Sequence, residues 1–187
     1  DRLHRLDCCV ISDGGGALII ARPEIAKTLN RPKVGVKGWG EGYKHQNAGG
    51  IDLTYSATRM SGPMAFGKAG VTPADIKYAS IYDSFTISVI VQIEDLGFCE
   101  KGQGGKFVSD GNLISGVGKL PFNTGGLCNY HPSNRGGMTK VIEAVRQARG
   151  EAHPKVQVPN ADLVLANGKG GNLGSRQGCG TVILERE

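Results

Sequence analysis

The chain has 187 residues, of which 39% are hydrophobic and 21% charged, and its formal net charge at pH 7 is +5. This composition is typical of one soluble globular domain with a buried core, excludes a disordered chain, and contains no apolar run long enough for a membrane span. Because the positive charge is scattered and no basic run alternates with aromatic residues, nucleic-acid binding is not expected.

The N-terminal part predicts short elements bounded by glycine. Two apolar strands are expected over residues 8–11 and 17–21, with a run of three glycines between them. A short helix over residues 24–29 follows, opened by Pro23, since proline is tolerated at a helix start. Residues 34–43 are expected to form an extended segment.

The middle of the chain alternates helices with a brief strand. A helix is predicted over residues 54–68, and Thr72 is predicted to cap a turn that has a proline at its first position. A strand over residues 78–81 leads into a strongly apolar helix over residues 84–96. The crowded glycines that follow predict a long ordered loop or hairpin over residues 98–121.

The last part of the chain contains the best amphipathic helix, over residues 138–149. Its apolar face is expected to comprise Val141, Ile142, Val145 and Ala148, and its water-exposed face Lys140, Glu143, Arg146 and Arg149. Short buried strands are predicted over residues 162–166 and 181–184. This alternation of helices and strands predicts a layered α/β domain, in which a site usually lies on loops at the strand ends.

Three loops that directly follow predicted strands carry the side chains best suited to chemistry: residues 82–85, 123–137 and 167–172. In the second loop, NTGGLCNYHPSNRGG, His131 stands between two glycine pairs. Imidazole moves protons near neutral pH, and glycine lets backbone N–H groups approach a ligand. If the strand ends share one edge of the sheet, His131, Tyr82 and glycine N–H groups converge on one substrate carbonyl. The alternative is a tight turn that holds a histidine without function.

Four motifs, in order along the chain, resemble the thiolase superfamily. Residues 12–17, SDGGGA, are similar to the family's S-D-G-A-A-A near the end of its N-terminal half. Residues 82–85 sit where thiolases carry N-E-A-F or, in the sterol-carrier branch, H-D-C-F. Residues 123–137 resemble N-x-x-G-G…G-H-P-x-G-x-x-G, and residues 143–152 resemble the end of the following helix, Q-L-R-G-x-A. The resemblance spans nearly the whole chain.

The resemblance implies the fold and its division into domains. Residues 1–30 would end the N-terminal thiolase domain, and residues 31–187 would form the C-terminal one. The expected fold class is α/β, with a mixed five-stranded sheet between helix layers. This is half of the family's five-layer α-β-α-β-α fold.

The resemblance also implies the substrate, the cofactors and the oligomeric state. Family members act on acyl-coenzyme A thioesters, so such a thioester is the expected substrate, with no tightly bound cofactor and with a homo-oligomer of the complete subunit. The family's nucleophilic cysteine lies in the N-terminal half, so none of the five cysteines here takes that role. Their odd number and the lack of C-x-x-C spacing favour a reducing cytoplasm, and no metal-ligand spacing is present.

Departures from the family pattern narrow the expected reaction. The family's second cysteine, in C-x-G-G, would fall around residues 167–171, where this chain reads NGKGG. Tyr130 replaces the glycine before the histidine, and Tyr82 replaces the asparagine or histidine that orients a catalytic water. These changes resemble the lipid-transfer-protein and non-decarboxylating acyltransferase branches. Some members there cleave β-hydroxyacyl thioesters by retro-aldol chemistry with a small OB-fold partner protein.

The resemblance assigns six residues to the site, three catalytic and three substrate-binding: His131, Tyr82 and Gly171, then Asn123, Tyr130 and Gly170. His131 would hydrogen-bond the thioester oxygen or activate a cysteine outside this chain, and N–H groups near Gly171 would hold the other oxyanion. Tyr82 would position water or substrate. The structural alternatives are a turn for the glycines, a loop anchor for Asn123 and a buried, hydrogen-bonded phenol for Tyr82. Asp83 is expected to cap the helix that follows it.

The expected function is therefore a thiolase-like acyltransferase that forms or cleaves a C–C bond next to a coenzyme A thioester. Two alternatives stay open. One is a retro-aldol lyase of β-hydroxyacyl-coenzyme A, and the other is a carrier that binds acyl-coenzyme A or lipid without catalysis.

Overall fold

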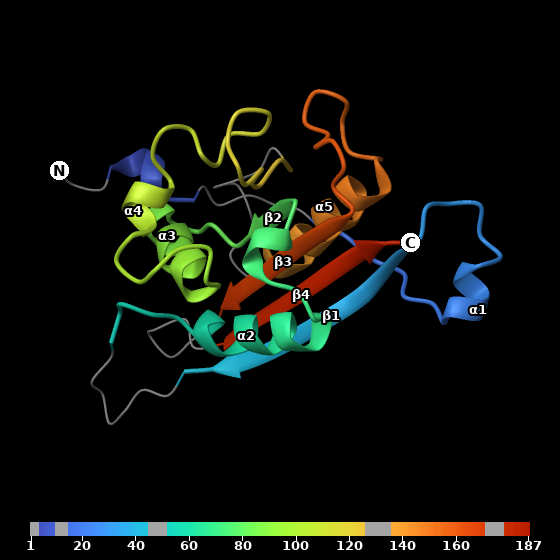
Figure 1. The fold of residues 1–187 in the computed structure, drawn as a ribbon, viewed down its shortest axis with the longest axis horizontal. Coiled ribbons are helices and arrows are strands. Elements are labelled where there is room, and N and C mark those ends of the chain that lie inside the picture. Colours follow the sequence, from blue (N-terminus) through green and yellow to red (C-terminus); the bar gives the residue numbers. More distant parts are fainter. Residues whose placement is uncertain (1–3, 10–14, 45–51, 126–135, 171–177) are drawn as a thin grey trace.

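The computed structural model describes residues 4–9, 15–44, 52–125, 136–170 and 178–187. Its strands are β1 (Val34–Tyr43), β2 (Tyr78–Ile81), β3 (Leu163–Gly170) and β4 (Gly178–Arg186). They form one mixed sheet in the spatial order β1-β4-β3-β2 (Figure 1). β2 and β3 are parallel, and β4 runs antiparallel to both β3 and β1. The ends of β2 and β3 that lead into predicted site residues therefore lie at the same edge of the sheet.

Helices cover both faces of this sheet. They are α1 (Pro23–Ala26), α2 (Thr58–Ala69), α3 (Thr86–Asp95), α4 (Gly104–Phe107) and α5 (Gly136–Arg149), with short 3₁₀ turns at Arg5–Asp7 and Pro73–Asp75. Figure 1 shows α2 on one face of the sheet and α5 on the other. The predicted α/β class, with a sheet between helix layers, is confirmed.

Two apolar clusters fill the space between the layers, because alternate side chains of a strand point to opposite faces. The cluster on the side of α2 and α3 includes Ala65, Ile81, Ile93, Leu165 and Ile183. The cluster on the side of α5 includes Ala144, Ala148, Val164, Ala166 and Leu184. Both faces of β3 and β4 are therefore buried, as expected for the central strands of a layered α/β sheet.

Helix α2 lies directly on the backbone of β1. Gly38, Gly40 and Gly42 occupy alternate positions of this strand and face the helix. A Cβ atom placed at Gly40 would come within 2.8 Å of the Cβ of Met64 and closer still to the carbonyl oxygen of Ser61. Glycine in β1 is thus required by the close approach of the helix and not by an unusual backbone angle.

The sheet has four strands where five were expected, and the fifth position is held by a single bridge. At the outer edge of β2, Ala79 forms an isolated parallel bridge with Phe122. The N–H of Ala79 donates to Pro121 O (3.0 Å), and the N–H of Asn123 donates to Ala79 O (3.1 Å). Pro121 has no N–H to donate, and Asn123 has φ 45°, outside the β region. The bridge therefore cannot extend into a strand across these neighbours.

The two strands predicted near the N-terminus are wrong in the part of the chain that the structure describes. Cys8 makes one bridge, with Phe85, and residues 15–22 have no regular structure. The side chains of Ile19 and Ile20 are 95% and 89% exposed. An apolar run becomes a strand only where another strand offers hydrogen-bond partners, and none lies beside the described residues here.

Within the described residues, no helix has the length and apolar character needed to cross a bilayer. The predicted long loop over residues 98–121 contains one short helix, α4. Residues 34–43 and 78–81 form strands with the predicted bounds.

Candidate active site

The loops predicted to converge do so where the structure describes them. Tyr82 directly follows β2, and its N–H donates to the carbonyl oxygen of Asn167 in β3 (2.9 Å). Asn123 lies on the other side of β2 and bonds to Ile81, the last residue of that strand. Gly170 ends β3. These three predicted site residues therefore stand at the same edge of the sheet, where β2 and β3 end. The other three, His131, Tyr130 and Gly171, lie outside the described residues.

Asn123 anchors the strand end. Its Oδ1 accepts a hydrogen bond from the N–H of Ile81 (2.8 Å), and its Nδ2 donates to Ile81 O (2.9 Å). The same Nδ2 donates to Asp83 Oδ2 (3.1 Å). The side chain is 5% exposed. These contacts match the loop-anchor alternative, and its contact with substrate stays a prediction.

Asp83 does not cap a helix, contrary to the prediction. Helix α3 begins at Thr86, and the residue at its N-cap is Phe85. The Asp83 carboxylate instead pairs with Lys140 of α5, with 2.9 Å between Oδ1 and Nζ. Both side chains are almost completely buried, with 6% and 5% exposure. A buried carboxylate requires a partner of opposite charge, and the sequence pattern alone does not identify this one.

Two charged residues predicted to face water on α5 are buried. Lys140 and Glu143 are 4% and 7% exposed, whereas Arg146 lies at the surface, as predicted. Glu143 accepts hydrogen bonds from Thr124 Oγ1 (2.9 Å) and from Gln147 Nε2 (3.0 Å). Helical periodicity assigned these positions to solvent because it assumes that charged residues stay hydrated.

Tyr78, at the start of β2, belongs to the same polar cluster. The N–H of Thr124 donates to its hydroxyl oxygen (3.1 Å), and the hydroxyl oxygens of Tyr78 and Thr124 are 3.2 Å apart. Burial raises the pKa of Tyr78 to about 12, although the hydrogen bonds from Thr124 act in the opposite direction. The phenol therefore stays neutral at physiological pH.

Tyr82 is the buried phenol at the opposite end of β2, 4% exposed. Its backbone is held from two sides, by Asn167 through the N–H and by Gln92 Nε2, which donates to Tyr82 O (2.7 Å). Close by in sequence, the hydroxyl of Ser84 is buried and has no hydrogen-bond partner among the described residues. Hydrogen bonds therefore hold the strand end on two sides, and one buried hydroxyl beside it has no partner among the described residues.

The N-terminal end of α5 lies against the end of β3. The Cα atom of Gly137 would be 3.1 Å from a Cβ atom placed at Gly168. Among the described residues, nothing lies within 4 Å of a Cβ atom placed at Gly170. The two glycine-rich segments singled out in the sequence therefore meet at the site.

Asn167 directly precedes Gly168, which falls at the second cysteine of the family pattern C-x-G-G when Gly170 and Gly171 are aligned with its two glycines. It is fully buried, its Nδ2 donates to Thr181 Oγ1 (2.8 Å), and its Oδ1 accepts from Thr58 Oγ1 (3.4 Å). Thr58 also contacts the sulfur of Cys179 (3.2 Å), in β4. Burial raises the pKa of the Cys179 thiol, so this thiol is a poor acid or base.

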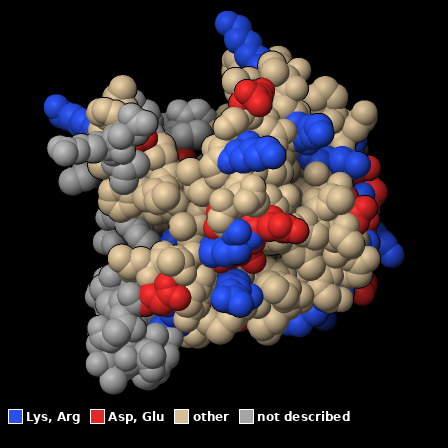
Figure 2. Space-filling model, turned by 60° about the vertical axis from the view of Figure 1, so that its left-hand side comes forward, with Lys and Arg blue, Asp and Glu red and all other residues tan. Residues whose placement is uncertain are grey.

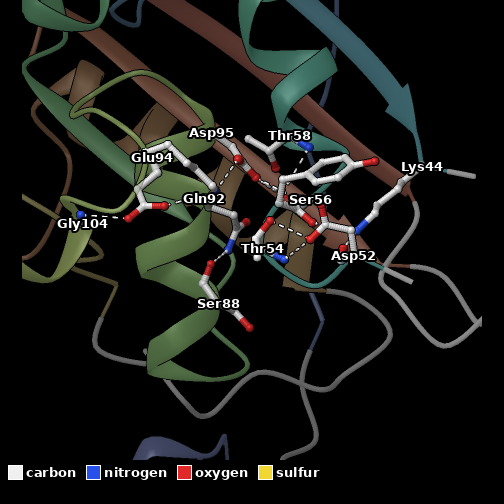
Figure 3. A network of polar contacts seen from close by, with 12 residues as sticks. Lys44, Asp52, Thr54, Ser56, Thr58, Ser88, Gln92, Glu94, Asp95 and Gly104 are labelled. Atoms are coloured by element: carbon white, nitrogen blue, oxygen red, sulfur yellow. Dashed lines mark hydrogen bonds and ion pairs between the residues drawn. The ribbon is translucent and has the colours of Figure 1, made fainter. Parts of the chain in front are cut away.

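A polar network fixes the segment before α2 to the end of α3 (Figure 3). Asp95 accepts hydrogen bonds from the N–H of Ser56 (2.6 Å) and from its hydroxyl (2.8 Å), and pairs with Lys101. The hydroxyl of Ser56 in turn accepts from the N–H of Thr58 (3.4 Å). Thr58 also donates to Asn167, so this chain of hydrogen bonds links Asp95 at the end of α3 to Asn167 in β3.

A cavity of about 310 Å³ lies beside the buried ion pair. Its wall includes Lys140, Glu143 and Asn123, together with Gly15 and Gly16 from the N-terminal segment. Among the described residues, no group of three or more His, Cys, Asp or Glu side chains is arranged to hold a metal ion. On the face shown in Figure 2, basic side chains are interspersed with acidic ones and form no continuous basic surface.

The layered α/β fold is that of a thiolase-like domain. The sequence model of the family described as "Thiolase C-terminal domain-like" matches residues 40–186, and the chain belongs to this family. The resemblance inferred from the four motifs is confirmed.

Known relatives include both lyases and transferases. The steroid side-chain-cleaving aldolase of Thermomonospora curvata is 37% identical over 161 residues, which cover 79% of this chain and 39% of that protein. The acetyl-CoA acetyltransferase of Methanothermobacter thermautotrophicus is 36% identical over 183 residues, covering 94% of this chain and 46% of that protein. A solved structure of the Ltp2-ChsH2(DUF35) aldolase superimposes with a TM-score of 0.84 and 33% identity, covering 98% of this chain and 47% of that one. The chain spans less than half the length of each.

Proposed function

We propose that this chain supplies half of the active site of a retro-aldol lyase, which cleaves the Cα–Cβ bond of a β-hydroxyacyl-coenzyme A. The observation that carries this proposal is the lack of a thiol in residues 167–171, the region of the family's second cysteine. Aligned on the two glycines of C-x-G-G, the cysteine position is Gly168, and Asn167 beside it is a buried amide. A Claisen thiolase uses that cysteine to move a proton at the substrate α-carbon. Neither a glycine nor an amide can exchange a proton in this way, whereas cleavage of a β-hydroxyacyl thioester needs a base at the hydroxyl group instead.

Two of the described cysteines lie away from the strand ends that carry Tyr82 and Asn123. Cys179 contacts Thr58 of α2 and is buried, and Cys99 lies in the loop after α3. Cys8 and Cys9 contact the loop that follows Tyr82, through a bridge from Cys8 to Phe85 and a hydrogen bond from Cys9 N to Ser84 O (2.9 Å). We assign neither of them a catalytic role.

The reaction balances without a second substrate. A base in the site takes the proton of the β-hydroxyl group, the Cα–Cβ bond breaks, and a carbonyl product forms on the β-carbon. The bonding electron pair remains as the enolate of the thioester, which is protonated at Cα to give the shorter acyl-coenzyme A. We assign Tyr82 and Tyr130 to the hydroxyl proton, and His131 with the N–H groups near Gly171 to the enolate oxygen. Asn123 and Gly170 would contact the substrate.

A thiolase-like acyltransferase is the second candidate. It is favoured by the acetyl-CoA acetyltransferase relative, which is similar over 94% of this chain. It requires a nucleophilic cysteine, which the family carries in its N-terminal half.

The likeness to the Ltp2-ChsH2(DUF35) aldolase supports a two-component assembly. By analogy, the complete subunit would form a homo-oligomer and bind a small OB-fold partner. We further propose that the protein is cytoplasmic. It would need no tightly bound cofactor, with a coenzyme A thioester as its substrate.

Product analysis of the full-length subunit with its partner tests the proposal. We expect a β-hydroxyacyl-coenzyme A to yield a shorter acyl-coenzyme A and a carbonyl compound in equal amounts, without added coenzyme A. Tyr82→Phe should lower kcat by about 10²–10⁴-fold, as for the loss of an acid–base group. His131→Ala should lower it by about 10²–10³-fold, because one oxyanion donor is lost.

Tyr78→Phe is the matched control, because it removes another buried hydroxyl from the same strand, at its opposite end. It should keep kcat within a few-fold of the wild type. Coenzyme A-dependent cleavage of a β-ketoacyl thioester, with no lyase activity, would establish the acyltransferase instead.

A further inference from the structure

The buried ion pair of Asp83 and Lys140 joins the two elements that flank the predicted catalytic loop. Asp83 follows Tyr82 at the end of β2. Lys140 lies in the second turn of α5, the helix into which the segment carrying His131 leads. The two charged atoms are 2.9 Å apart. This contact therefore ties the strand that carries one predicted catalytic residue to the helix that follows another.

Each carboxylate oxygen of Asp83 contacts a different element. Oδ1 pairs with Lys140 Nζ, and Oδ2 accepts a hydrogen bond from Asn123 Nδ2 (3.1 Å). Asn123 in turn uses both ends of its amide on the backbone of Ile81. A shift of α5 relative to β2 would consequently disturb three successive contacts that end at the residue before Tyr82.

Stability alone does not account for an ion pair in this position. Removing two charges from water opposes folding, and replacement of such a pair by apolar side chains of similar size is often neutral or stabilising. Polar pairs in buried positions are best known for fixing one arrangement of elements over others. Lys37 and Glu185 form a contrasting pair on β1 and β4, with 2.8 Å between Nζ and Oε2 and with 29% and 46% exposure.

We propose that Asp83 and Lys140 are positioning residues of the active site, which hold the first turns of α5 in register with the strand end that carries Tyr82. This inference rests on the proposed lyase function. The ion pair acts through Tyr82 and His131 and does not touch the substrate. Lys140 also lines the cavity of about 310 Å³ beside α5.

Near-isosteric neutral variants of the full-length enzyme with its partner test the inference. Asp83→Asn and Lys140→Met each leave one buried partner unpaired, and the double variant removes both charges. We expect the double variant to melt within a few degrees of the wild type, since no charge is left unpaired, but to have a kcat lowered by about 10–100-fold with KM within about threefold. A double variant with both wild-type stability and wild-type kcat would overturn the inference.

A second measurement keeps this result separate from the fate of the proposed function. In the double variant, amide hydrogen exchange should accelerate in residues 81–85 and 136–140 and stay unchanged in α2. Lys37→Met is the matched control, since it breaks an ion pair away from the site, and it should alter neither kcat nor exchange in these segments. If the wild type has no lyase activity, the proposed reaction is wrong, and the positioning role is then judged from hydrogen exchange alone. Faster exchange in the double variant, confined to residues 81–85 and 136–140, supports the positioning role. Unchanged exchange in these residues overturns it.

Discussion

The hydroxyl of Tyr78 is enclosed between β2 and α5, where Thr124 donates to it and Glu143 lies close by. Burial raises its pKa from 10.0 to about 12. Between these two values the unfolded chain releases the phenolic proton while the folded chain keeps it. The contribution to folding is thus fully present below pH 10 and is lost as the pH rises towards 12, by an amount on the order of 2–3 kcal/mol.

Tyr78→Phe isolates this contribution. At pH 8 we expect the variant to be less stable than the wild type by about 1–3 kcal/mol, because the N–H of Thr124 loses its buried acceptor. Since phenylalanine does not ionise, the difference should shrink above pH 10 and approach zero or reverse near pH 12. Urea unfolding at a series of pH values measures it. A stability difference independent of pH would show that the Tyr78 pKa is not raised by folding.

Single residues also show what the sequence can predict about a site. Tyr82 and Asn123 were expected at strand ends on one edge of the sheet, and they lie there, because loops after parallel strands open on the same side. Their catalytic roles stay predictions. The pairing of Asp83 with Lys140 was missed, because a local rule assigned each of them, one to a helix cap and the other to water. Neither rule takes account of a partner distant in sequence.

At the scale of elements, the sequence was most informative where one element buries a face. The strand over residues 78–81 is largely apolar and the helix over residues 138–149 is amphipathic, and the structure has elements there with bounds that agree closely. The run over residues 17–21 is as apolar but is not a strand, because no described strand lies beside it. Whether such a run forms a strand thus depends on a neighbouring strand for hydrogen bonding and not on its apolar content.

The contact of α2 with β1 depends on glycine. Gly40→Ala would place a methyl group within 2.8 Å of Met64 Cβ and against the carbonyl oxygen of Ser61, so the helix would have to move away from the strand. We expect a loss of about 1–3 kcal/mol or more of unfolding free energy, as for overpacking in a core. Chemical denaturation of the purified chain gives this value.

Gly180 in β4 is the matched control for this substitution. It is also a strand glycine, but no described residue lies within 4 Å of a Cβ atom placed there, and its position is exposed. Gly180→Ala should change stability by less than about 1 kcal/mol. Equal losses in the two variants would mean that strand propensity, and not the contact with α2, requires glycine at residue 40.

At the scale of the whole molecule, the described part of the chain packs closely from residue 31 onward. Arg31 pairs with Glu151 at 2.8 Å, and Arg149 Nε donates to Pro32 O at 3.0 Å. Before this point, α1 has no buried residue, and Ile19 and Ile20 are exposed. The domain boundary between residues 30 and 31 stays a prediction. The boundary itself is open to direct test.

Truncation to residues 31–187 provides that test. It removes two described hydrogen bonds between the N-terminal segment and the start of α3, from Cys9 N to Ser84 O (2.9 Å) and from Thr86 Oγ1 to Asp7 Oδ1 (2.8 Å). At about 1 kcal/mol each, and about 2–4 °C per kcal/mol for a domain of this size, these hydrogen bonds predict a Tm lowered by roughly 4–8 °C. Circular dichroism should still show one cooperative transition. If the truncated chain melts without cooperativity, residues 1–30 belong to the same folding unit as the sheet, because its core then depends on them.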